Sequence, residues 1–147
     1  MKYGYSVETK ENLAYAHVQN ENASFKQSVM ISKFIRGRDV NVAIEDLEKV
    51  AKLEKAIPFT RYKTHVAHKS GMAAGRYPVK CSEAFIRLLK SAKNNAKVKN
   101  LGENLVIMHV CAKKGASIKR YGRHRGRETK SVHIEVALMP YTKADKK

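Results

Sequence analysis

The feature that most constrains the fold is a strongly basic segment that lies between two apolar, β-prone segments near the C-terminal end of the chain. Residues 112–130 contain eight Lys or Arg, one His and a single acid. The flanking residues 104–112 and 131–139 are rich in β-branched side chains, and the second segment alternates between apolar and other residues. This pattern predicts an antiparallel hairpin over about residues 104–139 with a basic tip.

The hairpin is expected to extend beyond the core. If the pairing continues to Ile118, about 13 residues at roughly 3.3 Å each give a finger on the order of 40 Å long. A small core cannot cover that length, and like charges at this density repel each other, so the tip needs an anionic partner. We expect the tip to be disordered in the free protein and ordered when it is bound.

The net charge of the chain indicates nucleic acid as that partner. Thirty Lys and Arg against 13 Asp and Glu give a formal charge of +17 on 147 residues and a pI near 10.0. A membrane partner is not indicated, because residues 1–6 contain no apolar signal core and the longest apolar run, residues 105–112, is far shorter than the roughly 20 residues of a spanning helix. We expect a soluble, intracellular protein with one domain over residues 1–147.

The first part of the chain predicts a strand and a helix. Residues 13–19 carry aromatic and β-branched side chains before a polar turn, which is typical of a short strand. A capping box formed by Ser24 and Gln27 is expected to start a helix that ends at Gly37. The apolar face of this helix is formed by Met30, Ile31, Phe34 and Ile35.

A second helix is expected to begin after Asp39, which is a suitable N-cap. Its apolar positions recur at helical spacing and are Val40, Ala43, Ile44, Leu47 and Ala51. The face predicted to lie in solvent is formed by Glu45, Asp46, Glu48, Lys49 and Lys52. Because the charge of that face is mixed, we expect it to face solvent or a basic protein neighbour rather than phosphate.

A third helix is expected just after Pro78 and ends before the break at residues 100–102. Its core stripe is formed by Cys81, Phe85, Leu88, Leu89, Ala92 and Ala96. Its basic face is formed by Arg87, Lys90, Lys93, Lys97 and Lys99. We predict that this face contributes to a continuous anion-binding surface.

Residues 58–80 have no sustained period and no acid, and they contain two Gly and two Pro, so we interpret them as a loop. The basic side chains of this loop are suited to phosphate contact, and Tyr62 and Tyr77 could stack on a base or sugar. The alternative is a connecting loop without a ligand. The basic side chains are Arg61, Lys63, Lys69, Arg76 and Lys80.

Catalytic sites, metal sites and cofactors are not indicated. The sequence has no Walker-type phosphate loop and no nucleophile elbow, and its clustered carboxylates fall on the predicted exposed helix face. His65 and His68 have irregular spacing to Cys81 and no CxxC partner, so we predict no metal. Both thiols, Cys81 and Cys111, are expected to be reduced and partly buried. The histidines expected at core or edge positions of strands are His17, His109 and His133.

Charge alone does not separate RNA from DNA. If the tip, the loop and the third helix neutralise about ten phosphates, the logarithm of affinity falls against the logarithm of salt with a slope of about −9 on duplex and about −7 on single strands. A long finger with Gly and Tyr at its tip suits a folded RNA better than a groove. An architectural DNA-binding protein is the alternative.

Several stretches together resemble a known family. They are residues 3–6 (YGYS), 34–37 (FIRG), 58–62 (PFTRY), 75–78 (GRYP), 85–96 and 125–127 (RGR), the last followed by His133, Ile134 and Glu135. The resemblance covers nearly the whole chain and is to the universal large-subunit ribosomal protein numbered twenty-two in bacteria and seventeen in eukaryotes. The long basic loop resembles the archaeal and eukaryotic branch.

The resemblance implies an α+β fold in which a three-stranded antiparallel sheet packs on three helices and a long extended β-hairpin reaches through ribosomal RNA. It also implies a structural, non-enzymatic role in the large subunit of cytoplasmic ribosomes. In that role the protein binds large-subunit rRNA and supports assembly, and its hairpin contributes to the nascent-peptide exit tunnel. The implied partners are rRNA, neighbouring ribosomal proteins and the nascent chain.

Residue roles follow from the resemblance together with the charge pattern. Only five residues separate Arg127 from His133, where many relatives have more, so the tip is expected to be short. The tip predicted to line the tunnel is formed by Arg120, Tyr121, Gly122 and Arg123. Contacts to rRNA are predicted for Arg61, Lys63, Lys69, Arg76, Lys80, Lys113, Lys114, Lys119, Arg120, Arg123, His124, Arg125, Arg127 and Lys130.

Overall fold

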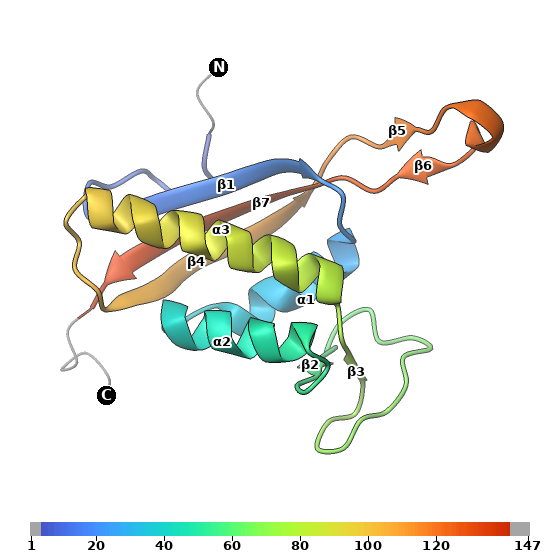
Figure 1. The fold of residues 1–147 in the computed structure, drawn as a ribbon, viewed down its shortest axis with the longest axis horizontal. Helices are drawn as coiled ribbons and strands as arrows, with labels where there is room; N and C mark the ends of the chain where they lie inside the picture. Colours follow the sequence, from blue (N-terminus) through green and yellow to red (C-terminus); the bar gives the residue numbers. More distant parts are fainter. Residues whose placement is uncertain (1–3, 142–147) are drawn as a thin grey trace.

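The centre of the molecule is an antiparallel sheet of three strands. A computed structural model describes residues 4–141. The strands β1 (Ala14–Glu21), β4 (Leu105–Lys114) and β7 (Val132–Pro140) are arranged in the order β1-β7-β4 (Figure 1). The last strand in the sequence therefore lies in the middle. This position suits its apolar content, because the residues from Ile134 to Leu138 are all buried, on both faces of β7.

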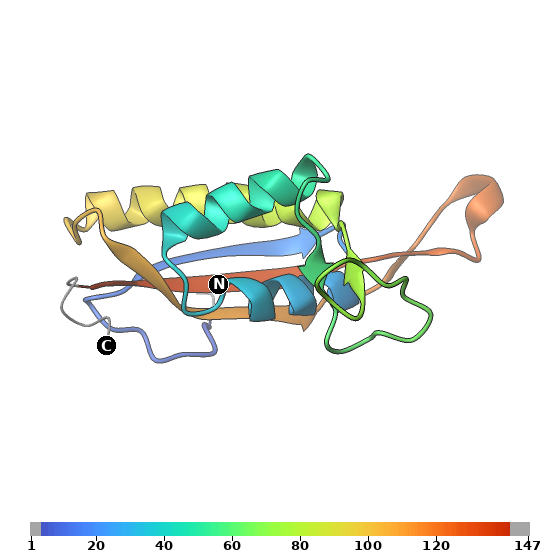
Figure 2. The same ribbon diagram turned by 90° about the horizontal axis from the view of Figure 1, so that it is seen from below.

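Three α-helices in the described range 4–141 pack against this sheet: α1 (Phe25–Ile35), α2 (Val40–Ala51) and α3 (Val79–Val98). Helix α3 lies over β1 and β7, α2 packs beside α3, and α1 contacts β4 (Figures 1 and 2). The predicted α+β fold with a three-stranded antiparallel sheet and three helices is confirmed. The largest side chains buried between the layers include Met30, Ile31, Ile35, Leu47, Phe85, Leu89, Ile107, Ile134 and Leu138.

The outer edge of β4 is covered by the link between α1 and α2. The backbone N–H of Gly37 donates to the carbonyl oxygen of Ile107 at 2.9 Å, and the N–H of Ile107 donates to the carbonyl oxygen of Arg38 at 2.9 Å. Gly37 adopts φ +74°, which a residue without Cβ reaches at little cost. The turn after α1 therefore pairs with a strand edge that would otherwise be open to another chain.

The predicted helix starts are partly confirmed. Asp39 accepts a hydrogen bond from the N–H of Asn41 at 2.8 Å, and α3 begins directly after Pro78. The capping box at α1 is wrong, because the Ser24 side chain makes no cap hydrogen bond and the Gln27 side chain accepts one from the Cys81 thiol at 3.3 Å. A contact to α3, distant in sequence, has replaced the local one.

The exposed position predicted for Asp46 is also wrong. Its residue is only 6% exposed, and its two carboxylate oxygens accept hydrogen bonds from Arg38 at 2.6 Å and Lys55 at 2.7 Å. Asp46 lies three residues after Ala43 and four before Val50, so it falls on the buried stripe of α2. Two cations from the flanking turns make its burial possible.

The hairpin between β4 and β7 continues outward as a finger, which we define as residues 115–130. The main ladder ends at the pair Lys114 and Val132, and a second short ladder joins β5 (Ile118–Lys119) to β6 (Glu128–Thr129). A 3₁₀ turn, η1 (Gly122–His124), closes the tip. The prediction that the pairing continues to Ile118 is confirmed, with an irregular stretch at residues 115–117.

The predicted loop is closed at its base by a short ladder between β2 (Ile57–Pro58) and β3 (Gly75–Arg76). We call residues 59–74 the basic loop. Two side chains of the loop pack closely against Gly75, so that a Cβ there would lie 2.6 Å from Met72 Sδ and 2.9 Å from Lys69 Cγ. The finger and the basic loop extend from the same end of the molecule (Figures 1 and 2).

The N-terminal segment crosses the face of the sheet that is opposite to α2 and α3 (Figure 2). The rings of Tyr5 and Tyr15 lie 4.9 Å apart, and the N–H of Ser6 donates to Glu135 at 3.3 Å. This segment therefore covers part of a sheet face that would otherwise be open. Tyr3, the first residue of the family-like stretch 3–6, lies outside the described residues.

Candidate nucleic-acid interface

The finger carries half of the predicted contact residues, and they are all exposed. No residue between 116 and 128 is buried, and Tyr121 at the tip is 95% exposed. The main-chain bond from Arg120 N–H to Arg127 O, 2.8 Å long, holds the two arms together next to the tip. The exposed cations of the finger are Lys119, Arg120, Arg123, Arg125, Arg127 and Lys130, with the single acid Glu128 among them.

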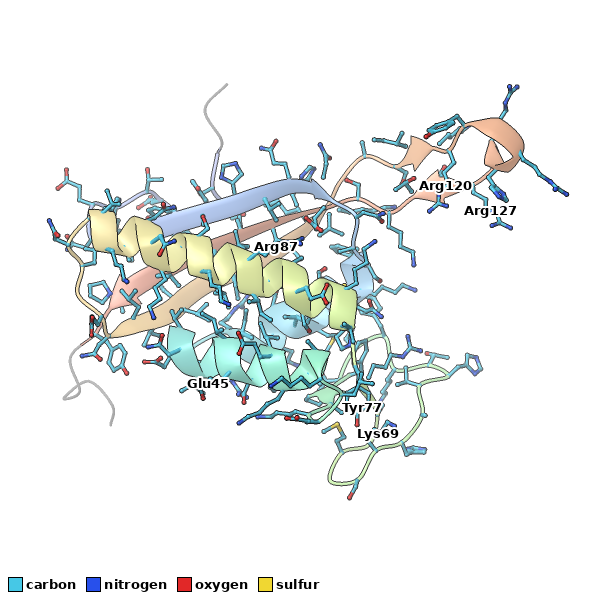
Figure 3. The ribbon with its side chains drawn as sticks, in the orientation of Figure 1. Glu45, Lys69, Tyr77, Arg87, Arg120 and Arg127 are labelled. Atoms are coloured by element: carbon cyan, nitrogen blue, oxygen red, sulfur yellow. The ribbon has the colours of Figure 1, made fainter. Side chains whose placement is uncertain are left out.

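None of these six cations forms an ion pair with another residue in the range 4–141. The finger therefore presents its charge outward, supported by two arms that bury almost nothing between them. Figure 3 shows Arg120 and Arg127 on it, at the end of the molecule where Lys69 and Tyr77 of the loop region also lie. This arrangement fits an anionic partner that surrounds the finger.

The basic loop and the residues that follow it up to Lys80 present a second group of exposed cations, three of which are held against aromatic rings. The Lys69 ammonium lies 5.2 Å from the ring centre of Tyr77, and the Arg61 guanidinium lies 5.3 Å from that of Tyr62. The Arg76 guanidinium lies 5.7 Å from the Phe59 ring. Such contacts orient a cation without neutralising it, so the charge is still available to phosphate. Lys63 and Lys80 are exposed as well.

The basic face of α3 differs from the prediction, because most of its cations already have partners within the molecule. Arg87 pairs with Glu21 at 3.1 Å and Lys90 with Glu48 at 3.4 Å. Lys93 donates to the Asn41 side chain at 2.7 Å, and Lys99 donates to the Leu13 carbonyl oxygen at 2.8 Å. These partners belong to α2, to β1 and to the residue that directly precedes β1. The contacts to Asn41 and Leu13 do not neutralise Lys93 and Lys99, but the C-terminal end of α3 lies at the opposite end of the molecule from the finger (Figure 1). We therefore limit the candidate interface to the finger and the basic loop.

Lys113 also differs from the other predicted contact residues. Adjacent residues of a strand point to opposite faces, and Lys113 points to the sheet face that the N-terminal segment crosses. Its ammonium donates to Glu135 Oε2 at 3.1 Å, while Glu135 Oε1 lies 3.3 Å from His109 Nε2. Lys114, the next residue, is exposed on the other side at the root of the finger.

Glu135 is a buried carboxylate, 1% exposed, in the middle strand. Burial acts to raise its pKa, but the hydrogen bonds from Ser6 N–H, Lys113 and His109 outweigh burial, and the net pKa lies below the ordinary value. The same charge contributes to the raised pKa of Tyr5, for which burial is the larger cause. Glu135 is therefore ionised at neutral pH and ties the N-terminal segment to the sheet.

Potential metal ligands occur together in one group within the described range: the ligand atoms of His109, Cys111 and Glu135 lie within 4.8 Å of one another. Lys113 already supplies the positive charge that Glu135 requires, and we assign no metal to this group. The three residues considered from the sequence, His65, His68 and Cys81, do not form such a group in residues 4–141. Cys81 is a buried free thiol whose pKa burial raises, and Cys111 is a half-buried free thiol.

Sequence patterns did not point to Lys26, which the structure places at the root of the finger. Lys26 is exposed in the first turn of α1, and its ammonium lies 5.6 Å from the Tyr62 ring centre. The sequence signal was a basic residue directly after a helix start. Its proximity to the finger depends on the packing of α1 against β4, which sequence periodicity does not reveal.

Within residues 4–141, none of the helices combines the length and the apolarity required to cross a membrane.

Comparison with known proteins gives consistent matches. The family model described as ribosomal protein L22p/L17e matches residues 16–139. A protein of Thermoplasma acidophilum named large ribosomal subunit protein uL22 is 43% identical over 119 residues, which cover 80% of this chain and 79% of that protein. The protein of the same name from Methanoregula boonei is 40% identical, covering 93% of this chain and 96% of the relative. That from Archaeoglobus fulgidus is 40% identical, covering 82% and 81%.

Proposed function

The chain belongs to the ribosomal protein L22p/L17e family, and from this membership we propose that it is a structural constituent of the large ribosomal subunit that binds ribosomal RNA through the finger and the basic loop. The proposal includes support of subunit assembly and a contribution of the finger to the nascent-peptide exit tunnel. Neighbouring ribosomal proteins and the nascent chain are its further partners, and its place is the ribosome in the cytoplasm. No step of this role is catalytic.

The observation that carries the proposal is the finger itself. A two-arm extension whose residues from 116 to 128 are never buried gains little stability from its own contacts, so its retention in the fold requires an outside partner. Its six cations, which have no ion-pair partner among residues 4–141, and its single acid favour a negatively charged partner. A large, folded RNA can enclose such a finger on several sides, whereas a duplex groove admits it on one.

The tip residues are proposed to approach the tunnel wall because they are the part of the finger most distant from the body. Tyr121 and the 3₁₀ turn of Gly122 to His124 contribute an exposed ring and a compact backbone at that end. Arg120 and Arg123 lie on either side of the ring in the sequence. We assign RNA contact to the arginines and the tunnel-facing position to the segment from Arg120 to Arg123.

Sedimentation tests this function directly. The full chain, mixed with large subunits that lack it, is expected to cosediment with them in a sucrose gradient at moderate salt, whereas recovery only in the free-protein fractions would contradict the proposal. The test variant, Arg123→Gln with Arg125→Gln, changes two exposed arginines of the finger. The control, Lys97→Gln, changes an exposed lysine on α3. The finger variant should lose occupancy at lower salt than the control.

The same charge could serve an architectural DNA-binding protein. Competition between large-subunit rRNA and duplex DNA of equal phosphate concentration separates the two functions. We expect rRNA to displace the chain from DNA, and a preference for duplex DNA would favour the other function.

A further inference from the structure

A recess lies at the root of the finger, where four segments of the chain meet. Its volume is about 510 Å³, within the range of roughly 300–1,000 Å³ that small-molecule sites occupy. The start of α1 and Tyr62 of the basic loop form its body side. The other side is formed by Lys114 at the end of β4 and by Ser117 and Lys130 of the finger. The recess therefore lies between the two surfaces already assigned to RNA.

The lining of the recess is suited to an anion. It includes Lys26, Lys114 and Lys130 and no acidic residue. All three lysines are exposed, and none of them forms an ion pair with another residue in the described part of the chain. Three uncompensated ammonium groups around one hollow repel one another, and a phosphate between them would relieve that repulsion.

The recess also has an aromatic wall. Phe25 and Tyr62 are half-buried and pack against the hydrophobic core, so their rings are held in place rather than free to move in solvent. Tyr62 adopts φ +58°, in the left-handed region that a bulky residue rarely occupies. Residues held in this way are concentrated at ligand-binding positions. Lys26 and Arg61 already lie against this ring, so a base that stacks on it takes the place of one of these two cations.

Ser24 adds an unused polar group. It stands at the N-cap position of α1, where a serine hydroxyl normally accepts a bond from the helix, but its side chain makes no cap hydrogen bond. The hydroxyl can therefore donate to or accept from a ligand in the recess.

We propose that this recess receives one unstacked nucleotide of the bound RNA. The base packs against Tyr62 and Phe25, and the phosphates on either side of it are held by Lys26, Lys114 and Lys130. The inference rests on the proposed function and adds a defined contact to it, because it names the place where a single nucleotide leaves the RNA stack and enters the protein. Proteins commonly recognise RNA by stacking splayed-out bases on aromatic side chains.

A peptide segment from a neighbouring protein is the other class of occupant that could enter the recess. An acidic peptide would match the charge, but its carboxylates do not by themselves supply a flat ring for the Tyr62 face. The combination of an immobile aromatic wall with three separate cations suits a base flanked by phosphates better.

Chemical probing of the RNA in the complex tests the inference. Large subunits reassembled with the full-length protein are compared with those that carry Tyr62→Ala, Tyr62→Phe or the control Lys97→Ala. One nucleotide is expected to be protected by the unchanged chain and by Tyr62→Phe, which keeps the ring. Tyr62→Ala should expose that nucleotide and weaken binding on the order of ten-fold, while the finger footprint persists. Lys97→Ala should change neither.

A second set of variants keeps the test valid if Tyr62→Ala disturbs the loop. Lys26→Ala and Lys114→Ala alter exposed side chains that the fold does not need, and each should increase the reactivity of the same nucleotide and of its neighbours. If no variant changes the reactivity of any single nucleotide while the finger footprint is intact, the inference is overturned and the proposed function stands. If the chain leaves no footprint on RNA at all, the proposed function fails with it.

Crosslinking identifies the occupant. A photoreactive phenylalanine at position 62 in the assembled subunit should crosslink to one RNA nucleotide. A crosslink to a neighbouring protein would overturn the inference in favour of a peptide.

Discussion

The two halves of the same hairpin are stabilised in different ways. In the inner half, β4 and β7 pair over most of their length, and β7 buries Val132, Ile134, Val136 and Leu138 against the helices. In the outer half, β5 and β6 share two residue pairs, and Ile118 is 63% exposed. One continuous hairpin therefore begins as part of a hydrophobic core and ends as a charged extension. The inner half needs only the chain, and the outer half needs a partner.

The largest expected effect comes from removing buried volume in the inner half. Ile134→Ala should lower the free energy of unfolding by about 2–5 kcal/mol, because it removes apolar contacts and leaves a cavity in the core. Ile118→Ala, the matched change in the outer half, should alter it by about 0.5 kcal/mol or less. Urea denaturation followed by circular dichroism measures both. Equal losses for the two variants would remove the distinction between the halves.

The next effect is on RNA affinity, for which the outer half of the hairpin should matter more than the inner half. Replacing Arg120, Arg123, Arg125 and Arg127 with Gln removes four cations that have no ion-pair partner in the range 4–141. The slope of log affinity against log salt should become less steep by about 3, which corresponds to roughly a hundred- to a thousand-fold weaker binding near 0.1 M salt. Filter binding to large-subunit rRNA over a salt series measures this slope.

As a control, the free energy of unfolding of the arginine variant should equal that of the unchanged chain. An unaltered salt slope would mean that the finger does not contact phosphate.

A smaller effect concerns the anchoring of the N-terminal segment to the sheet. Glu135→Gln should lower the free energy of unfolding by about 1–3 kcal/mol at neutral pH, because Lys113 loses its charged partner. The pKa of Glu135 is lowered in the folded protein, so its contribution to stability is present above the ordinary pKa of a glutamate. That contribution is lost as the pH falls through the folded-state pKa.

Comparing the pH dependence of stability in the two proteins tests this account. The unchanged chain and Glu135→Gln should converge only once the pH has fallen below the folded-state pKa of Glu135, which lies under the ordinary glutamate value, since both then carry a neutral group at position 135. A difference that persists at low pH would show that the substitution acts through packing rather than charge.

The smallest effect distinguishes two neighbouring lysines at the boundary between the halves. Lys113→Gln should reduce stability by about 1 kcal/mol or less, since its ammonium pairs with Glu135 while remaining partly exposed. Lys114→Gln should leave stability unchanged and make the salt slope of RNA binding less steep by about 1. Thermal unfolding and filter binding, measured on both variants, check this. Identical behaviour of the two lysines would contradict the assignment of opposite faces.

Local sequence patterns predicted the elements whose signals are contained within a few residues. Asp39 caps α2, Pro78 precedes α3, and the alternation in β7 gives its buried face. Helical spacing could also have placed Asp46 on the buried stripe of α2. Its charge led to the prediction that it lies in solvent. The cations that allow its burial, Arg38 and Lys55, belong to the flanking turns.

Local sequence patterns could not predict contacts between segments that are distant in the sequence. Ser6 reaches Glu135 across 129 residues of sequence, and Arg87 pairs with Glu21 across 66. The second pair is one of the contacts that hold basic side chains of α3 against the body of the molecule. The recess at the root of the finger could not be predicted for the same reason, because it joins Lys26, Tyr62, Lys114 and Lys130 from separate elements. The finger itself was predictable, since its charge and its flanking strands are contiguous.

The most direct test of the claim that an outside partner holds the finger is amide hydrogen exchange on the free chain and on the chain bound to large-subunit rRNA. The N–H of Arg120 is hydrogen-bonded to Arg127 O but lies in an exposed ladder, whereas the amides of β7 lie in the core. We predict fast exchange at Arg120 in the free chain, strong protection there in the complex, and protection of β7 in both. Strong protection of the finger in the free chain would contradict the account.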